Sequence, residues 1–363
     1  MFAMVEHRSV LLPRRGPSAS GLTVLLALWS SGVLMMFAGV ACVSAATAPK
    51  RPVIIDTDLG SYMDDTAAIL LALQSPELDV KLIVTATNDT TARARVMAKY
   101  LLAVNRTDVP IGIGVPGLET LQTLYAWAGN IDLRTYTEKQ GGTVYEDGVK
   151  AMYDVIVSSP IPVDIIAIAP PTNFPSLLKR YPAAVYSVNS VRAMIGSIHR
   201  GYDNSTTPVA EYNARLCVEC TRVMFAANWP VAMTPLDTCG YVNLAGVSYH
   251  ALLRGDSEAS RAFAESWVYF CSVSGVDHCS LMPLRSGPLM DTVATLLAMP
   301  TTAEEFVQMT ALRINVTATG MTVVVGGGEG RSVDVALSWR DGNLGLSQFL
   351  MWLGKSIAGA GDL

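Results

Sequence analysis

The chain has 363 residues, of which 50% are hydrophobic and 16% are charged, and its formal net charge is −5. A mildly acidic chain without a basic cluster does not fit a nucleic-acid-binding protein, which needs a basic surface. The length is sufficient for a large buried core, arranged in one or two domains.

The first 50 residues differ in character from the rest of the chain. Arg14 and Arg15 precede a stretch, residues 16–49, that holds no charged residue and whose apolar part ends in small residues. This order is typical of a secretory signal peptide, here residues 1–46. The apolar run within residues 16–46 is also long enough for an uncleaved signal-anchor, and a transit peptide is a third alternative. The first two interpretations predict a secreted or extracytoplasmic protein, or one tethered to a membrane.

From Arg51 onward, short β-rich runs alternate with amphipathic helical stretches. The strand RPVIID is followed by a helix over Asp64–Gln74, and the strand DVKLIVTATN by a helix over residues 90–104. Further strands are predicted at 110–115, 162–169 and 191–197, with helices over Glu146–Val157, Asn173–Arg180 and Glu211–Ala227.

The remainder of the chain is predicted to be mainly helical over Val247–Pro300. It then returns to strands at 312–319, 321–327 and 332–339, before a last helix near Leu344–Leu353. Repeated β-then-α units of this length predict one α/β domain over residues 51–363, with an open, mostly parallel, Rossmann-like central sheet flanked by helices.

Five cysteines follow the signal segment: Cys217, Cys220, Cys239, Cys271 and Cys279. An odd number allows at most two disulfides, so one thiol stays free or pairs between chains. A zinc site is not expected, because the chain has only four His and none is suitably spaced.

The most informative segment is VIIDTDLGSYMDDTAAILLAL. Asp56 and Asp58 stand where the first predicted strand ends, and Asp64 and Asp65 open the next helix. Ligands bind at the carboxyl ends of strands in open α/β sheets. Four carboxylates so close together repel one another unless a cation lies between them, and calcium accepts several carboxylate, carbonyl and water oxygens. Gly60 allows the tight turn that brings the two pairs together.

Two other interpretations of this segment are weaker. A solvated turn with Asp64 as a helix N-cap would need one or two Asp, and not four beside a buried strand. A phosphatase of the haloacid dehalogenase type also begins with a strand and DxD, but it needs Thr or Val where this chain has Gly60.

DTDLGSYMDD followed by AAILLAL resembles the amino-terminal signature of the inosine–uridine-preferring nucleoside hydrolase family. The resemblance continues in order through TATND, APPTNFPSLL, PVAEYNA, PLDT and PLMDTVATLLAMP, over most of residues 51–300. It implies a nucleoside hydrolase that cuts the N-glycosidic bond between ribose and base, and the amino-terminal segment adds the expectation that this enzyme is exported. The usual family spacing between the two Asp pairs is shorter by two residues.

The resemblance implies a calcium site and a general base. Carboxylates of Asp58, Asp65 and Asp291 and the backbone carbonyl of Thr172 would hold Ca²⁺. The metal would lower the pKa of a bound water, and Asp58 would take the proton of that water as it attacks the anomeric carbon. Asp56 would brace the ligands without touching the metal.

The resemblance also implies residues that bind the ribose, because an oxocarbenium-like transition state requires a firmly held sugar. These residues are Asp64, Asn88, Glu211 and Asn213, with Asn204 as the group for the 5′-hydroxyl. Asn204 lies one residue further upstream than the family's Asn and begins a glycosylation sequon.

The leaving-group residues depart from the family pattern. Met290 stands where many members have a His, and His199, His250 and His278 fall outside the family's motifs. The purine-preferring branch stacks the base between Trp rings, and Trp127 and Trp267 lie in suitable regions of the sequence. We therefore expect purine nucleosides to be favoured.

Two further functions stay open on the sequence. One is a catalytically weak, extracellular nucleoside-binding relative, since the family's His residues are missing. The other is a hydrolase of another N-ribosyl compound, such as nicotinamide riboside. In each case we expect a small-molecule partner, no nucleic acid, and a homo-oligomer.

Overall fold

The computed structural model describes residues 49–118, 120–121 and 123–359. The predicted signal or anchor segment, residues 1–46, lies outside these described residues. Within them, the structure contains no helix that combines the length and the apolar character needed to cross a membrane.

The described strands form one ten-stranded sheet in the order β4-β3-β2-β1-β5-β6-β7-β10-β8-β9. From β4 to β7 all neighbours are parallel, β10 is parallel to β7, and the β10–β8 and β8–β9 pairs are antiparallel. The mostly parallel α/β fold is therefore confirmed. The strand bounds are β1 Arg51–Thr57, β2 Leu78–Thr85, β3 Ile111–Gly112, β4 Val144–Tyr145, β5 Val163–Ala167, β6 Val188–Met194, β7 Val231–Thr234, β8 Val307–Val316, β9 Thr322–Val324 and β10 Arg331–Trp339.

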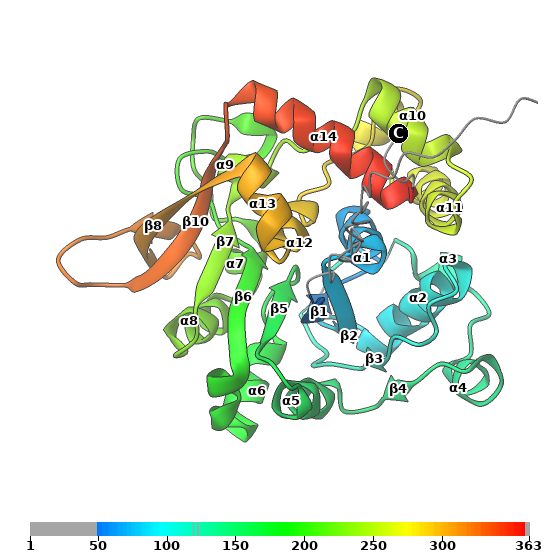
Figure 1. The fold of residues 1–363 in the computed structure, drawn as a ribbon, viewed down its shortest axis with the longest axis horizontal. Helices are drawn as coiled ribbons and strands as arrows, with labels where there is room; N and C mark the ends of the chain where they lie inside the picture. The colour runs from blue at the N-terminus through cyan, green and yellow to red at the C-terminus, as the bar shows by residue number, and fades with distance from the viewer. Residues whose placement is uncertain (1–48, 119, 122, 360–363) are drawn as a thin grey trace, which may run out of the picture. The chain divides into compact units, whose positions relative to one another are not determined.

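Helices cover both faces of the parallel part of the sheet (Figure 1). On one side of the sheet, a single apolar cluster contains residues of α1 Asp64–Gln74, α2 Thr90–Ala103, α10 Gly246–Arg254, α11 Glu258–Val273, α12 Thr292–Leu297, α13 Pro300–Phe306 and α14 Asn343–Ala358. The other face packs against α5 Gly148–Ser158, α6 Asn173–Arg180 and α8 Val218–Ala226.

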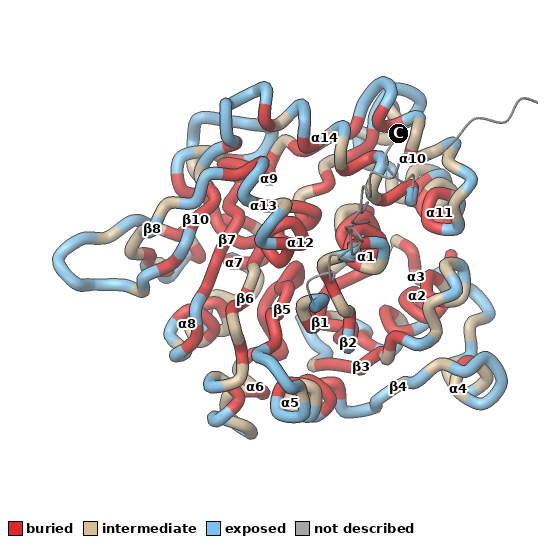
Figure 2. Tube along the Cα trace, in the orientation of Figure 1, coloured by how far each residue is buried: buried red, intermediate tan, exposed pale blue. Residues whose placement is uncertain are grey.

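Burial follows this layering. The central strands are buried along almost their whole length, whereas residues 326–330, in the turn between β9 and β10, are exposed (Figure 2). Strand β5, VDIIA, is entirely buried, as expected for a parallel strand with helices on both sides. Polar side chains that follow these strands therefore lie at the edge of an apolar core, where burial strongly affects their charge.

Short elements complete the connections between the layers. They are α3 Tyr125–Ala128, α4 Leu133–Gln140, α7 Tyr212–Leu216 and α9 Leu236–Cys239, with 3₁₀ turns η1 Pro182–Ser187, η2 Tyr202–Asn204 and η3 Asp277–Leu281. The continuous helix predicted over Glu211–Ala227 is wrong: it is divided into α7 and α8 at Cys217, whose φ of −135° and ψ of 81° are not helical. Disulfides join Cys217 to Cys220 and Cys271 to Cys279, and Cys239 is a buried free thiol.

Candidate active site

A pocket of about 490 Å³ opens at the carboxyl edge of the parallel sheet. Asp58 reaches it from the loop after β1, Glu211 from the start of α7, and Asp291 from the start of α12. Parallel strands all end at this edge, so loops that are distant in sequence contribute to one wall. The lining residues are Asp58, Ser61, Tyr62, Asp64, Asp65, Leu121, Ile168, Met194, Tyr202, Asp203, Glu211, Tyr212, Asn213, Arg215, Pro288, Met290 and Asp291.

Three of the carboxylates lie especially close together. One oxygen from each of Asp64, Asp65 and Asp291 falls within 4.8 Å of the others, and Asp65 and Asp291 are buried. The predicted ligand set named Asp58 in place of Asp64. Asp64 and Asp65 both stand in the first turn of α1, so the two carboxylates stay next to each other at the pocket although the loop before the helix is longer than usual in the family.

Burial raises the pKa of the buried carboxyls in this region, namely Asp56, Asp58, Asp64, Asp65, Glu211 and Asp291. The pKa of Asp65 and that of Asp291 are raised well above their usual value by burial and by neighbouring carboxylates. Burial raises the pKa of Asp64 to about 7, with Asp58 adding to the effect. Neighbouring carboxyl groups that are held out of water are stable only when they are protonated or when a cation compensates their negative charge.

Hydrogen bonds orient the carboxyls that point away from solvent. The Thr57 hydroxyl donates to the Asp65 carboxylate and accepts from the backbone N–H of Leu59 at 3.1 Å. Asn173 donates from Nδ2 to Asp56 Oδ2 at 2.8 Å, while burial raises the pKa of Asp56 to about 7. Asp56 is not among the residues that line the pocket.

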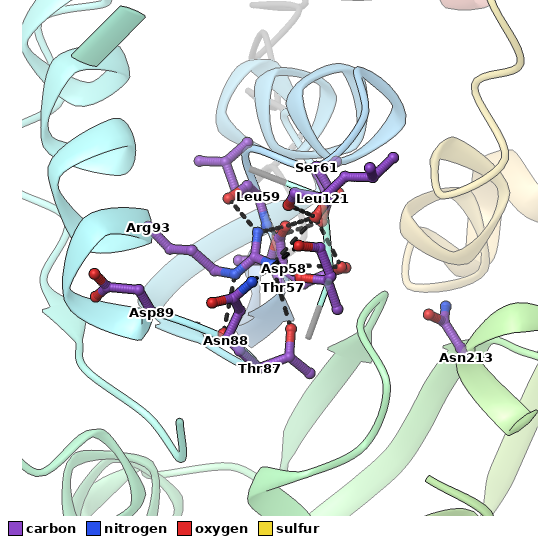
Figure 3. Close-up of polar contacts among 12 residues, drawn as sticks. Thr57, Asp58, Leu59, Ser61, Thr87, Asn88, Asp89, Arg93, Leu121 and Asn213 are labelled. Atoms are coloured by element: carbon purple, nitrogen blue, oxygen red, sulfur yellow. Dashed lines mark hydrogen bonds and ion pairs between the residues drawn. The ribbon is translucent and has the colours of Figure 1, made fainter. Parts of the chain in front are cut away.

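Asp58 faces a different set of groups. The Ser61 hydroxyl lies 3.3 Å from Asp58 Oδ2, and Arg93 Nη2 lies 3.9 Å from the same oxygen (Figure 3). Burial raises the pKa of Asp58, and the Arg93 charge opposes that increase. The carboxylate thus stands on the pocket wall between a buried cation and the acidic cluster.

The opposite wall is formed by the start of α7. Glu211 caps the helix by accepting backbone N–H groups from Gly196, Asn213 and Ala214 at 2.8 to 3.1 Å. Asn213 donates from Nδ2 to the Met194 carbonyl at 3.0 Å, which leaves its side-chain oxygen as the atom that can accept a hydrogen bond from a ligand. Burial raises the pKa of Glu211 to about 7.

The donor set fits a hard divalent cation. All three clustered groups offer carboxylate oxygens, which calcium prefers. Among the described residues, Asp56 Oδ1 and Thr172 Oγ1 are buried and accept or donate no hydrogen bond. Thr172 lies at the start of α6, after β5, and β5 pairs with β1. A bound cation with its waters would supply partners for buried oxygen atoms of this kind.

Two sequence-based assignments are wrong, because both tryptophans belong to the core. Trp127 is buried, donates from Nε1 to Glu265 at 3.0 Å, and lies under Lys99 Nζ at 3.7 Å from the ring centroid. Trp267 is 1% exposed and donates from Nε1 to the Tyr249 hydroxyl at 2.6 Å. Neither ring lines the pocket, so neither can stack on a base bound there in this conformation.

Two predicted ribose ligands also lie outside the pocket lining. Asn88 donates from Nδ2 to the Thr120 carbonyl at 2.9 Å, in a half-buried turn with a φ of 49°. Asn204 is exposed, and its side-chain oxygen accepts from Arg200 at 2.8 Å. Its neighbours Tyr202 and Asp203 line the pocket instead.

Several pocket residues were missed by reasoning from the sequence. Tyr62, Tyr212 and Arg215 line the cavity, with the Arg215 guanidinium 5.9 Å from the centre of the Tyr212 ring. Tyr62 lies in the part of the first loop that is longer than usual in the family, and this extra length is the sequence feature that could have identified it. Arg93 is fully buried beside Asp58. The feature of the sequence that could have identified it is the position of an arginine on the apolar face of a helix.

The comparisons with known proteins agree on one family. The sequence profile described as inosine-uridine preferring nucleoside hydrolase matches residues 53–343. A non-specific ribonucleoside hydrolase RihC from Klebsiella pneumoniae is 32% identical over 201 residues, which cover 54% of this chain and 64% of that protein. The corresponding protein of Salmonella typhi is 31% identical over 198 residues, covering 53% and 63%. The chain therefore aligns with less than two thirds of these relatives' length.

Solved structures share the fold at lower identity. A plant nucleoside hydrolase, PpNRh1, superposes with a TM-score of 0.69 at 18% identity, covering 86% of this chain and all of that one. A purine-preferring ribonucleoside hydrolase from Gardnerella vaginalis gives 0.65 at 18% identity, covering 85% and 99%.

Proposed function

Because the chain belongs to the inosine-uridine preferring nucleoside hydrolase family, we propose that it hydrolyses the N-glycosidic bond of ribonucleosides to give ribose and a free base. The observation that carries the proposal is the group of three carboxylates, Asp64, Asp65 and Asp291, in a pocket that also holds Asp58, Glu211 and Asn213. A water-activating cluster and a sugar-binding wall in one cavity are the two requirements of this reaction.

Calcium is the cation that we propose for the site. Asp65 and Asp291 would hold it, with Asp64 or Asp58 as the third carboxylate and Thr172 contributing its carbonyl. When bound, the ion would lower the pKa of a water molecule and orient it. Carboxylate and carbonyl oxygens with flexible geometry favour calcium over magnesium, which requires a near-ideal octahedron.

Residues of the chain would accept the proton of the attacking water and hold the ribose. Asp58 stands on the pocket wall and would accept the proton of the attacking water. Glu211, Asn213 and Asp64 would hold the ribose hydroxyls, so that C1′ faces the water. As the oxygen bonds to C1′, the C1′–N bond breaks, its electron pair goes to the base, and a proton must reach that base.

The leaving base would lie against the tyrosines of the pocket. Tyr62 and Tyr212 line the cavity together with Met290, Pro288 and Arg215. Met290 cannot donate a proton, so purines, whose N7 can accept one, should leave more readily than pyrimidines. We propose a purine preference on this basis.

A nucleoside panel assayed with and without chelator tests the proposal. Inosine, guanosine, adenosine, uridine, cytidine and nicotinamide riboside should be compared by the release of reducing sugar. Turnover of at least one ribonucleoside that disappears on chelation is the expected result. Tight nucleoside binding without any turnover would favour the alternative, a nucleoside-binding relative, and turnover of nicotinamide riboside alone would favour another N-ribosyl substrate.

We further propose that the protein is exported by residues 1–46, with a membrane tether through residues 16–46 as the alternative, and that it forms a homo-oligomer. Export would place the enzyme where extracellular nucleosides can be salvaged as free bases. Amino-terminal sequencing of the mature protein and its sedimentation velocity test these two points.

A further inference from the structure

Arg93 is an arginine with no exposed surface. It lies on the inner face of α2, where Thr90, Ala94, Met97 and Leu101 are also buried. A guanidinium cannot lose its charge in a protein, so its burial is tolerated only where acceptors surround it. Those acceptors belong to the loops of the candidate active site.

The Arg93 guanidinium contacts backbone carbonyls on two sides. Nη1 donates to the carbonyl of Asp58, by a short contact, and to that of Leu59 at 2.8 Å. Nε donates to the carbonyl of Thr87 at 3.1 Å. Thr87 and the residue after it have positive φ angles of 63° and 49°, so this turn needs an external partner to hold it.

The third group of contacts is with hydroxyls. Nη2 donates to Ser61 Oγ at 3.1 Å and to the Thr120 hydroxyl. Ser61 in turn donates to the Leu121 carbonyl at 3.0 Å. One side chain therefore joins three segments: the loop after β1, the turn after β2, and the segment that precedes α3 (Figure 3).

The distances favour positioning over simple charge compensation. The closest approach of the guanidinium to the Asp58 carboxylate is 3.9 Å, which is too long for a hydrogen bond. The contacts with carbonyls and hydroxyls are much shorter. Because Nη1 holds two consecutive carbonyls, it fixes the peptide planes on both sides of Leu59. The first of these planes joins Asp58 to Leu59 and therefore helps to set the direction of the Asp58 side chain.

We propose that Arg93 is a positioning residue that holds the loop over residues 58–61 in place and thereby aims the Asp58 carboxylate into the pocket. This inference rests on the proposed hydrolase function, since Asp58 is there the group that accepts the proton. Arg93 itself lines no part of the pocket and does not touch the substrate.

The test compares Arg93→Lys with the control Arg95→Lys. Lysine keeps the charge but donates from a single nitrogen, so it cannot hold three carbonyls and two hydroxyls at once. Arg95 is exposed on the same helix two residues later. Thr120→Val is a milder second variant, because it removes one acceptor of Arg93 and leaves the arginine in place.

The kinetic expectation is a separation of kcat from KM. In Arg93→Lys we expect kcat per active site to fall about tenfold to a hundredfold, because the catalytic carboxylate would be wrongly oriented. KM should change little, because the proposed ribose-binding groups Glu211 and Asn213 stand at the start of α7, which Arg93 does not contact. Thr120→Val should lower kcat less, and Arg95→Lys should leave both constants unchanged. Wild-type kcat in both Arg93→Lys and Thr120→Val would overturn the proposal.

A second measurement does not depend on activity. Hydrogen–deuterium exchange should become faster in the loop over residues 58–61 of Arg93→Lys, and stay unchanged in α12. Unchanged exchange in that loop would refute the anchoring role. If the wild-type protein hydrolysed no N-ribosyl compound while the loop exchanged faster in Arg93→Lys, the proposed function would fail and the anchor would stand. Equal acceleration throughout the chain would mean a general structural role, and would also overturn the proposal.

Discussion

Asp65 and Asp291 bring carboxylate oxygens within 4.8 Å of each other, although they stand at the starts of helices that are far apart in the sequence, α1 and α12. Helix α1 also packs against α12, so the contact between the two residues is supported by apolar neighbours. Burial raises the pKa of both carboxyls, and the nearby Asp65 carboxylate adds to the increase at Asp291. The pair is therefore held together by packing against its own electrostatic repulsion.

Removal of the metal should destabilise the protein and abolish turnover. A chelator leaves the repulsion between Asp65 and Asp291 uncompensated, so the melting temperature should fall and should recover when calcium is added. Asp291→Asn should remove most of the calcium-dependent shift. Asp154→Asn, on the exposed side of α5, is the matched control and should keep the shift. Scanning calorimetry with and without calcium provides the measurement.

Stability of the metal-free protein should decrease as the pH rises. Asp56, Asp64 and Glu211 have pKa values raised to about 7 by burial, against roughly 4 in an unfolded chain. The folded state thus binds these protons more tightly. Their stabilising contribution is complete below about pH 4 and is lost as the pH rises through about 7. Chelated protein should melt at lower temperature at about pH 8 than at about pH 6, and a flat profile would contradict this account.

Asp58 and Asp64 should have separable roles. Asp58→Asn should nearly abolish kcat, because an amide cannot accept the proton of the attacking water. Asp64→Ala should weaken ribose binding and, since Asp64 belongs to the close carboxylate group, should also weaken calcium binding. Steady-state kinetics together with calcium titration calorimetry would distinguish the two. Hydrolysis at the wild-type rate by Asp58→Asn would disprove the mechanism.

The base preference should respond to Met290. Met290→His would add a proton donor to the pocket wall, so it should raise kcat/KM for uridine more than for inosine. Tyr62→Ala should lower kcat/KM for every nucleoside if this ring packs against the base. Competition assays on both substrates give the ratio directly. Equal effects of Met290→His on both nucleosides would mean that another group already supplies the proton.

Trp267 should matter for stability and not for substrate choice. Trp267→Phe removes the hydrogen bond to the Tyr249 hydroxyl inside the core and leaves a small void. We expect a loss of about 1–3 kcal/mol in the free energy of unfolding, with an unchanged order of nucleoside preference. Denaturant unfolding and the nucleoside panel measure the two quantities. A changed order of preference would restore the idea of base stacking.

The fold and the acidic cluster were predictable because both depend on short-range patterns. The buried strand β1, with Asp56 near its end and Asp58 directly after it, marks the carboxyl edge of the sheet in the sequence itself. The break at Cys217 was not predictable from helical spacing, since the residues on both sides keep an apolar face. Strand β7 was missed because its four residues are too short for a clear pattern.

The environment of each side chain was harder to predict than the positions of the helices and strands. Trp127 and Trp267 lie in the regions expected for base-stacking groups, yet only tertiary packing decides whether a ring faces a pocket or a core. Arg93 illustrates the opposite case. It lies on the apolar face of its helix, but three of its acceptors are backbone carbonyls of distant loops, and a backbone carbonyl leaves no trace in the identity of any residue.

The position of β10 has a consequence for incomplete chains. This strand is the last of the sheet in sequence but lies between β7 and β8. A polypeptide that ends before Arg331 would leave the backbone N–H and C=O groups along one side of β7 unpaired, next to a largely apolar surface. Such an open edge is a template for pairing with another chain. Carboxy-terminal truncation should therefore lead to aggregation, and chaperone dependence should persist until the final segment has been synthesised.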